Sequence, residues 1–201
     1  ASLPAWLRVL AGYLTVLGLS GWILSASAFI FLAGYAAIRV ESDPKWKRRA
    51  DTIKSMAAYV FVSVALSGLI ANLLKRSLGR ARPEHFTDGG IVHFAPFSGS
   101  SFESFPSGHA TTFGALAVCL CLLAPRFRFG FLIAGCWLAM TRVIIGAHYP
   151  SDVIAGFCFG AWFSWMMSYA FAKRDSVFRI NQQGWPILKQ PIPLTWKTRR
   201  D

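Results

Sequence analysis

Charged side chains are scarce in this sequence. Asp, Glu, Lys and Arg supply 15% of its 201 residues, whereas a typical soluble domain contains about 25%. Hydrophobic residues make up 54% of the chain, and the mean hydropathy is +0.44. This shortage of charge argues against an ordinary water-soluble domain and indicates that lipid is the main solvent of the chain.

Acidic residues are the rarest charged type, with 9 Asp and Glu against 21 Lys and Arg, and the formal net charge is +12. In a soluble protein such an excess would suggest a nucleic-acid partner. Here the basic residues stand between long apolar runs, where they set membrane topology and contact anionic head groups. We therefore expect a lipid bilayer as partner and no nucleic acid, while the oligomeric state stays open.

Cysteine is also sparse, and no metal-binding site is predicted from its positions. No two of the four cysteines have the spacing of a metal-binding pair. All lie inside apolar runs, where a free thiol behaves as a small hydrophobic group; they are Cys119, Cys121, Cys136 and Cys158.

Long apolar runs predict the fold class, an all-α integral membrane helical bundle. A transmembrane helix needs about 20 mostly apolar residues. Residues 4–18 are predicted to form an N-terminal interfacial or tilted helix, and whether it is a sixth transmembrane helix stays open. Five later stretches have the required character, at residues 20–39, 55–74, 106–124, 129–146 and 150–172.

The same pattern predicts the domain organisation. Residues 1–172 form one membrane-embedded domain, and residues 83–105 within it form a Gly-, Ser- and Pro-rich active-site loop. Residues 173–201 form a basic tail that we expect to be a surface or partly disordered segment. The phenylalanines around the loop suit a lid, an acyl groove or simple anchoring at the membrane surface; they are Phe86, Phe94, Phe97, Phe102 and Phe105.

Three polar runs interrupt the apolar pattern, at Lys75 to Pro83, Pro106 to His109, and Thr141 to Asp152. Because successive spans alternate in direction, all three runs fall on one side of the membrane. The opposite side carries 15 Lys and Arg against 6 on the side of the three runs. The positive-inside rule therefore predicts a cytoplasmic tail and an outer-face location for the three runs.

The first two runs contain residue types that bind phosphate. Lys75 and Arg82 are seven residues apart, about two helical turns, so their side chains can share a face. Ser107 and Gly108 open the third span, where free N–H groups and the helix dipole attract an anion. His109 is expected to face the same anion. Taken alone, the first run also fits a snorkelling helix end, and the second fits an ordinary capped helix start.

The third run pairs a histidine with an acid. Asp152 follows His148 by four residues, close enough to accept a hydrogen bond from Nδ1, which would leave Nε2 free to attack. Arg142 offers a fork of N–H donors that matches two phosphate oxygens. Charged groups at membrane depth are costly and usually functional. The three runs together therefore indicate a site that binds a phosphate group and cleaves its bond to the rest of the substrate.

Read in order, the runs spell Lys-x6-Arg-Pro, Pro-Ser-Gly-His and Thr-Arg-x5-His-x3-Asp. This pattern resembles the three-part signature of the type-2 phosphatidic acid phosphatase superfamily. The one departure is Thr141, where that family usually has serine, and threonine keeps the hydroxyl. The resemblance covers residues 75–152 by motif and residues 20–172 by helical layout.

The resemblance implies a metal-independent hydrolase of a membrane lipid phosphate. His148 would attack phosphorus and form a phosphohistidine, Asp152 would orient it, and His109 would protonate the leaving oxygen. The implied phosphate-binding residues are Lys75, Arg82, Ser107, Gly108 and Arg142. We expect no cofactor and no metal, because the carboxylates on that side make no paired set for Mg²⁺; they are Glu84, Asp88, Glu103 and Asp152.

Family members of this build include bacterial inner-membrane enzymes whose site faces the periplasm. Their substrates imply lipid A 1-phosphate, phosphatidylglycerol phosphate or undecaprenyl diphosphate for this chain. The stretches at residues 79–83 and 93–97 are similar to those of lipid A 1-phosphatases. A phosphotransferase that passes the phosphoryl group to an acceptor lipid is an alternative, and a non-catalytic scaffold or transporter on this fold is a more distant one.

Overall fold

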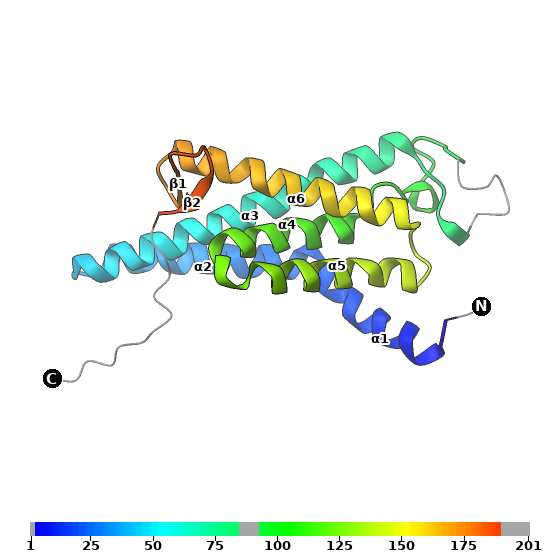
Figure 1. The fold of residues 1–201 in the computed structure, drawn as a ribbon, viewed down its shortest axis with the longest axis horizontal. Coiled ribbons are helices and arrows are strands. Elements are labelled where there is room, and N and C mark those ends of the chain that lie inside the picture. The colour runs from blue at the N-terminus through cyan, green and yellow to red at the C-terminus, as the bar shows by residue number, and fades with distance from the viewer. Residues whose placement is uncertain (1–2, 85–92, 190–201) are drawn as a thin grey trace.

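The structure is a computed structural model that describes residues 3–84 and 93–189. It is a bundle of long helices with one small hairpin (Figure 1). The helices are α1 (Ala5–Thr15), α2 (Ser20–Val40), α3 (Pro44–Leu78), α4 (Gly108–Leu123), α5 (Arg128–Ile144) and α6 (Pro150–Lys173). Short 3-10 turns lie at Val16–Gly18, Ser100–Phe102 and Pro125–Phe127, and the antiparallel strands are β1 (Phe178–Ile180) and β2 (Pro186–Leu188).

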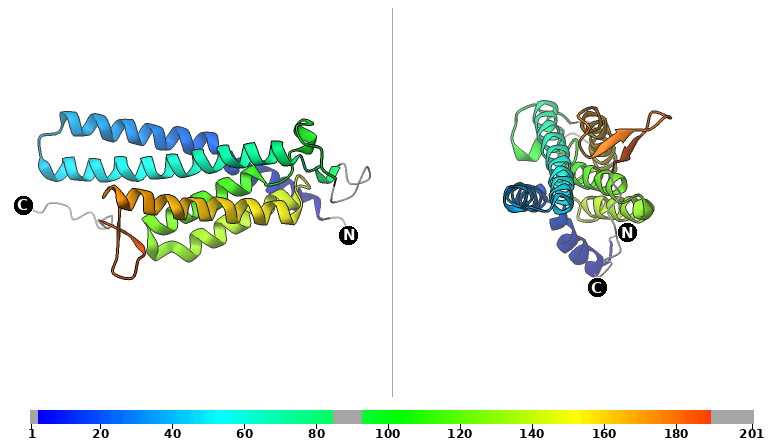
Figure 2. Two further views of the ribbon diagram at one scale, coloured as in Figure 1. Left: turned by 90° about the horizontal axis from the view of Figure 1, so that it is seen from above. Right: turned by 90° about the vertical axis from the view of Figure 1, so that its left-hand side faces the viewer.

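Helix α4 is the central element and packs against α3, α5 and α6. Helix α2 lies along α3, while α1 leaves the bundle at an angle and contacts α5 (Figure 2). Glycines bring α4 and α6 close together: a Cβ on Gly160 would lie 2.0 Å from the Thr111 carbonyl oxygen, and one on Gly156 would lie 2.4 Å from that of Ser107. Small residues permit such approach of helices in membranes. This contact places the start of α4 beside the start of α6.

The outer surface of the bundle is apolar. Large side chains such as Phe29 and Ile133 are 72% and 71% exposed, which is expected of a surface that faces lipid. Helix α4 is apolar but short, with 16 residues. Within residues 3–84 and 93–189, four segments are long and apolar enough to cross a membrane, namely Ala5–Val40, Pro44–Leu78, Pro125–Ile144 and Pro150–Lys173. The predicted all-α membrane bundle is confirmed.

Two helix boundaries are informative. The chain is extended at Leu19 (φ −69°, ψ 120°), so α1 and α2 are separate helices, as the predicted break requires. Helix α3 starts earlier than the apolar pattern predicts, and residues 44–54 are helical although they are polar. Asp43 explains this start, since its side chain accepts a hydrogen bond from the Lys45 N–H (2.8 Å) and Pro44 occupies the first helical position.

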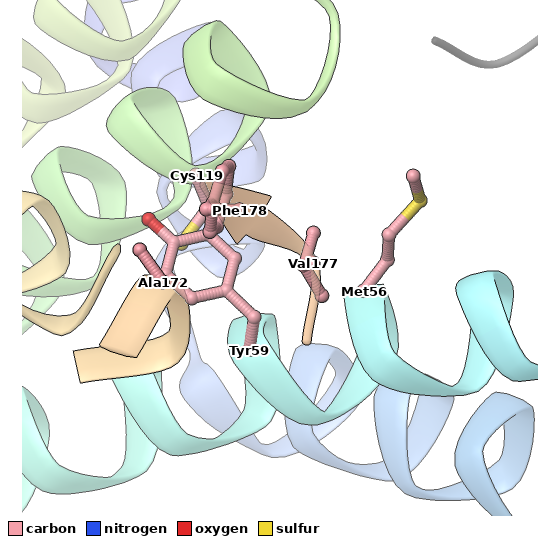
Figure 3. Close-up of a cluster of buried hydrophobic side chains, with 6 residues drawn as sticks. All are labelled: Met56, Tyr59, Cys119, Ala172, Val177 and Phe178. Atoms are coloured by element: carbon pink, nitrogen blue, oxygen red, sulfur yellow. The ribbon is translucent and has the colours of Figure 1, made fainter. Parts of the chain in front are cut away.

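The first part of the tail lies mostly at the surface, as expected, but it forms a hairpin that packs against the bundle and is not disordered there. Phe178 is fully buried, with its ring 4.9 Å from that of Tyr59 on α3, and Cys119 of α4 belongs to the same cluster (Figure 3). Strands of three residues give too short an alternation for sequence periodicity to detect. Residues 190–201 of the tail lie outside the described residues.

The three polar runs meet at one end of the bundle. The end of α3, the start of α4 and the turn between α5 and α6 lie together there, while the hairpin lies at the opposite end (Figure 1). The alternation of spans predicts that the three polar runs share one side, and the structure places them at the same end of the bundle.

Candidate active site

The first polar run leaves α3 through a tight turn at Gly79. Gly79 has φ +64°, which favours glycine, and its N–H donates to the carbonyl oxygen of Lys75 (3.0 Å). A Cβ at this position would lie 2.2 Å from the Ala95 carbonyl oxygen. The turn keeps Lys75 on the last helical turn and carries Arg80 into the protein, where it is only 7% exposed.

The second run caps α4. Ser107 is the N-cap, so Pro106 lies just before the helix and not in its first turn. The Ser107 side chain accepts a hydrogen bond from the Ala110 N–H (3.5 Å), and its own N–H donates to the Asp152 carbonyl oxygen (3.0 Å). Apart from the adjoining residues of the chain, no described residue has an atom within 4 Å of a Cβ built on Gly108. The start of α4 therefore has open space in which an anion can approach the free N–H groups.

His148 lies in the turn before α6 and is 5% exposed. Its Nδ1 is 2.8 Å from the backbone carbonyl oxygen of Ser104. Because a carbonyl only accepts, Nδ1 carries the proton and Nε2 is the free nitrogen. The nearest Asp152 oxygen is 3.7 Å from Nδ1, so the expected direct hydrogen bond from His148 to Asp152 is absent. Ser104 holds the ring instead, and Asp152 lies behind it as a nearby charge.

Asp152 is fully buried, and hydrogen bonds from three other residues compensate for the loss of water around its oxygens. Oδ2 accepts from the Ser104 hydroxyl (2.5 Å) and from the Tyr149 N–H (3.0 Å). Oδ1 accepts from Arg80 Nη1 (2.5 Å). Ser104 thus bonds both members of the pair, through its carbonyl to His148 and through its hydroxyl to Asp152. Ser104 therefore fixes the imidazole of His148 relative to the carboxylate of Asp152.

Arg80 and Ser104 both contact the Asp152 carboxylate, and neither was predicted from the sequence. The Arg80 guanidinium lies 4.5 Å above the Tyr149 ring and also donates to the Ser151 hydroxyl (2.8 Å). The sequence offered a reason to consider Arg80, because it stands two residues before Arg82 in the same basic run. Ser104 had no such signal, being one of several serines in the loop.

The predicted phosphate-binding cations lie near His109. Lys75, Arg82 and Arg142, together with His148, lie close enough to the His109 ring to interact with it electrostatically. Arg142 Nε is buried and has no hydrogen-bond partner among the described residues. Arg82 Nε donates to the Ser100 carbonyl oxygen (3.0 Å). The structure therefore brings the predicted set together around a site suited to an anion.

The N-terminal segment forms one wall of this site, which the sequence did not predict. Arg142 Nη1 donates to the Thr15 hydroxyl (3.1 Å) at the end of α1. A Cβ on Gly18 would lie 2.8 Å from Cδ2 of His109. The end of α1 thus contacts Arg142, and the 3-10 turn that follows it lies against His109.

Burial lowers the pKa of His148 below its ordinary value. The positive charges of Arg142 and Arg82 act in the same direction, and the nearby Asp152 carboxylate only partly opposes them. The ring is therefore neutral at neutral pH, which is the state that a nucleophile requires.

This environment predicts the acidic limb of the pH profile. As the pH falls through the pKa of His148, the ring gains a proton and loses its nucleophilic lone pair, so kcat/KM falls. Because the pKa is lowered, we expect the midpoint of that limb below about pH 6.5. The limb should move lower still in Asp152→Asn, which removes a charge that raises this pKa. A midpoint above pH 7, or one that Asp152→Asn leaves in place, contradicts the assignment.

Metal binding is not indicated by the part of the chain that the structure describes, where His, Cys, Asp and Glu form no group of three or more. Asp88 lies outside the described residues. Metal-independent chemistry stays a prediction, which the assay proposed below tests with a chelator.

Residues 56–176 match the PAP2 superfamily. The chain belongs to this superfamily. It is 48% identical over 188 residues to a "Lipid A 1-phosphatase" of Rhizobium johnstonii, covering 93% of this chain and 77% of the relative. It is 46% identical over 191 residues to a "Lipid A 1-phosphatase" of Rhizobium etli, covering 94% of this chain and 82% of the relative. The predicted family and enzyme class, a phosphatase, are confirmed.

A solved structure supports the PAP2 fold. The crystal structure of a transmembrane PAP2-type phosphatidylglycerolphosphate phosphatase from Bacillus subtilis superposes with a TM-score of 0.60. The two chains are 21% identical, and the match covers 88% of this chain and 82% of that one. At this identity the likeness concerns the fold alone.

Proposed function

We propose that this PAP2 phosphatase removes the phosphate of a membrane lipid, with lipid A 1-phosphate as the preferred substrate, through a phosphohistidine intermediate. The observation that carries the proposal concerns His148: its Nδ1–H donates to the Ser104 carbonyl oxygen, and its Nε2 is left unprotonated beside a cluster of cations. A neutral imidazole held in this way is a nucleophile.

The reaction has two steps. In the first, His148 Nε2 bonds to phosphorus while the bond from phosphorus to the lipid oxygen breaks, and His109 gives that oxygen a proton. In the second, His109 accepts a proton from water, whose oxygen attacks phosphorus and displaces His148, releasing inorganic phosphate. The second step frees His148 of the phosphoryl group and returns to His109 the proton that it gave in the first step. Both histidines therefore end in their starting states.

The cations and the start of α4 bind the phosphoryl oxygens. Lys75, Arg82 and Arg142 supply positive charge, and Ser107 and the Gly108 N–H supply donors at the helix start. Transfer of a phosphoryl group spreads negative charge over its equatorial oxygens, so fixed donors stabilise the transition state more than the ground state. The buried, unpartnered Arg142 Nε supports this role.

The proposed setting is the bacterial inner membrane, with the active site at the periplasmic face and the tail in the cytoplasm. The excess of Lys and Arg on the side opposite the site supports this orientation through the positive-inside rule. Lipid A 1-phosphate is preferred because the two Rhizobium relatives with that activity in their names match over more than nine-tenths of this chain. Phosphatidylglycerol phosphate and undecaprenyl diphosphate remain the competing substrates.

A phosphate-release assay with purified full-length protein tests the proposal. The panel contains lipid A 1-phosphate, phosphatidylglycerol phosphate, undecaprenyl diphosphate and phosphatidic acid, each in detergent with EDTA present. We expect release to be fastest from lipid A 1-phosphate, with a kcat/KM at least about tenfold above the others. Faster release from another lipid overturns the substrate. Phosphorylation of an added acceptor lipid without release of inorganic phosphate favours phosphotransfer. A requirement for added Mg²⁺ contradicts the metal-independent mechanism.

A further inference from the structure

A cavity of about 140 Å³ opens beside the phosphate site, between the end of α3 and the loop segment that follows residue 96. It is too small for a whole lipid, since ligand pockets usually measure about 300–1,000 Å³, and it suits a single ring of a larger substrate. Its lining residues are Arg76, Phe97, Ser98, Gly99, Phe102 and Glu103.

Glu103 connects this cavity to the phosphate site. One of its carboxylate oxygens lies 3.4 Å from Lys75 Nζ, and the other lies 3.3 Å from Arg76 Nε. Lys75 belongs to the cation cluster around His109, whereas Arg76 is 63% exposed and lines the cavity. A group bound in the cavity is therefore one residue away from the phosphate that Lys75 would hold.

Phe97 has an unusual conformation at the rim of the cavity. Its φ is +59°, a region that bulky residues rarely adopt. Its N–H donates to the Arg76 carbonyl oxygen (3.0 Å), which holds the backbone in place. Burial does not explain the arrangement, because the residue is 79% exposed. Strain of this kind is concentrated at ligand-binding sites, and here it presents an aromatic ring beside an arginine and a carboxylate.

We propose that this cavity binds the sugar ring that carries the scissile phosphate, and that it selects glycolipid phosphates over glycerolipid phosphates. A sugar ring has an apolar C–H face, which suits Phe97 and Phe102, and a rim of hydroxyls, which suits Arg76 and Glu103. An acyl chain fits poorly, because it would remove the Arg76–Glu103 ion pair from water without adding a hydrogen bond. This assignment rests on the proposed function and adds the feature of the substrate that the site recognises.

Competition by small soluble phosphates tests the assignment without a preferred lipid. Glucosamine 1-phosphate, glycerol 3-phosphate and inorganic phosphate are compared as inhibitors of phosphate release from whichever lipid the protein hydrolyses fastest. We expect glucosamine 1-phosphate to inhibit at least about tenfold more strongly than the other two. The advantage should fall to within about twofold in Phe97→Gly and in Arg76→Gln. Glycine at position 97 keeps the positive φ without strain, so this variant should fold.

Phe94→Ala is the matched control, because Phe94 is a 49% exposed phenylalanine of the same loop that does not line the cavity. It should keep the preference for the sugar phosphate. Equal inhibition by all three phosphates, or a preference that survives Phe97→Gly and Arg76→Gln, overturns the assignment. A uniform loss of activity in those variants with the preference retained means membrane anchoring and also overturns it. If no lipid releases phosphate, the proposed function itself fails.

Discussion

We expect His148→Ala to abolish phosphate release, with kcat lower by at least about 10⁴-fold, which is the scale measured when a covalent nucleophile is removed. The reason is geometric: His148 Nε2 is the free nitrogen of a neutral ring beside the phosphate-binding cations, and alanine has no atom that replaces it. The measurement is single-turnover phosphate release from the fastest lipid substrate, with purified variant and wild type compared at equal concentration.

His148→Asn is the matched variant that separates chemistry from folding. Its side-chain amide has the N–H donor needed for the Ser104 carbonyl oxygen, but it has no nucleophilic nitrogen. We expect the asparagine variant to elute from size exclusion like the wild type and to be as inactive as the alanine variant. Turnover within about tenfold of wild type in either variant would remove His148 from the nucleophile role.

Arg80→Ala should have the second-largest effect, because it leaves the Asp152 carboxylate buried without its cation. Breaking a buried ion pair from one side costs about 3–5 kcal/mol, and this pair has side chains that are 9% and 0% exposed. The released carboxylate also loosens Ser104 and, through it, His148, and a displacement near 1 Å lowers kcat by about 10²-fold. Thermal unfolding in detergent and steady-state kinetics measure the two effects.

Arg80→Lys tests whether the positive charge beside Asp152 is sufficient or whether the forked guanidinium group is also required. Lysine restores a charge for Asp152 but not the fork that also reaches Ser151, so we expect intermediate stability and kcat, with the acidic limb of the pH profile near that of wild type. Lys47→Ala, at an exposed position on the opposite side, should stay within about 0.5 kcal/mol of wild type. Equal activity of Arg80→Ala and wild type would contradict the positioning role.

Spacing in the sequence predicted the chemical residues because they stand at helix ends. Counting the apolar spans fixes which ends share a side of the membrane, and the three polar runs then fall together without knowledge of the packing. Lys75, His109 and His148 are predictable in this way. The count of spans does not say which atoms touch. The four-residue spacing predicted Asp152 as the partner of the His148 Nδ1 proton, whereas the structure has the Ser104 carbonyl oxygen there.

Contacts between distant segments could not be predicted from spacing. Ser104 reaches the site because its N–H donates to the Arg80 carbonyl oxygen (3.0 Å), which folds the loop back over the end of α3. Thr15 reaches Arg142 across 127 residues of sequence. Phe178 is buried by a hairpin too short to show periodicity. In each case the tertiary contact, and not the local pattern, decides the position of the residue.

The most direct test of the proposed mechanism is to trap the covalent intermediate. Full-length protein is mixed with a ³²P-labelled lipid phosphate, quenched in alkali within one turnover, and digested to locate the label. The mechanism predicts an alkali-stable, acid-labile phosphohistidine at His148, which disappears on a chase with unlabelled substrate and is absent from His148→Asn. Single-turnover release of labelled phosphate with no label on His148 at any quench time would contradict it.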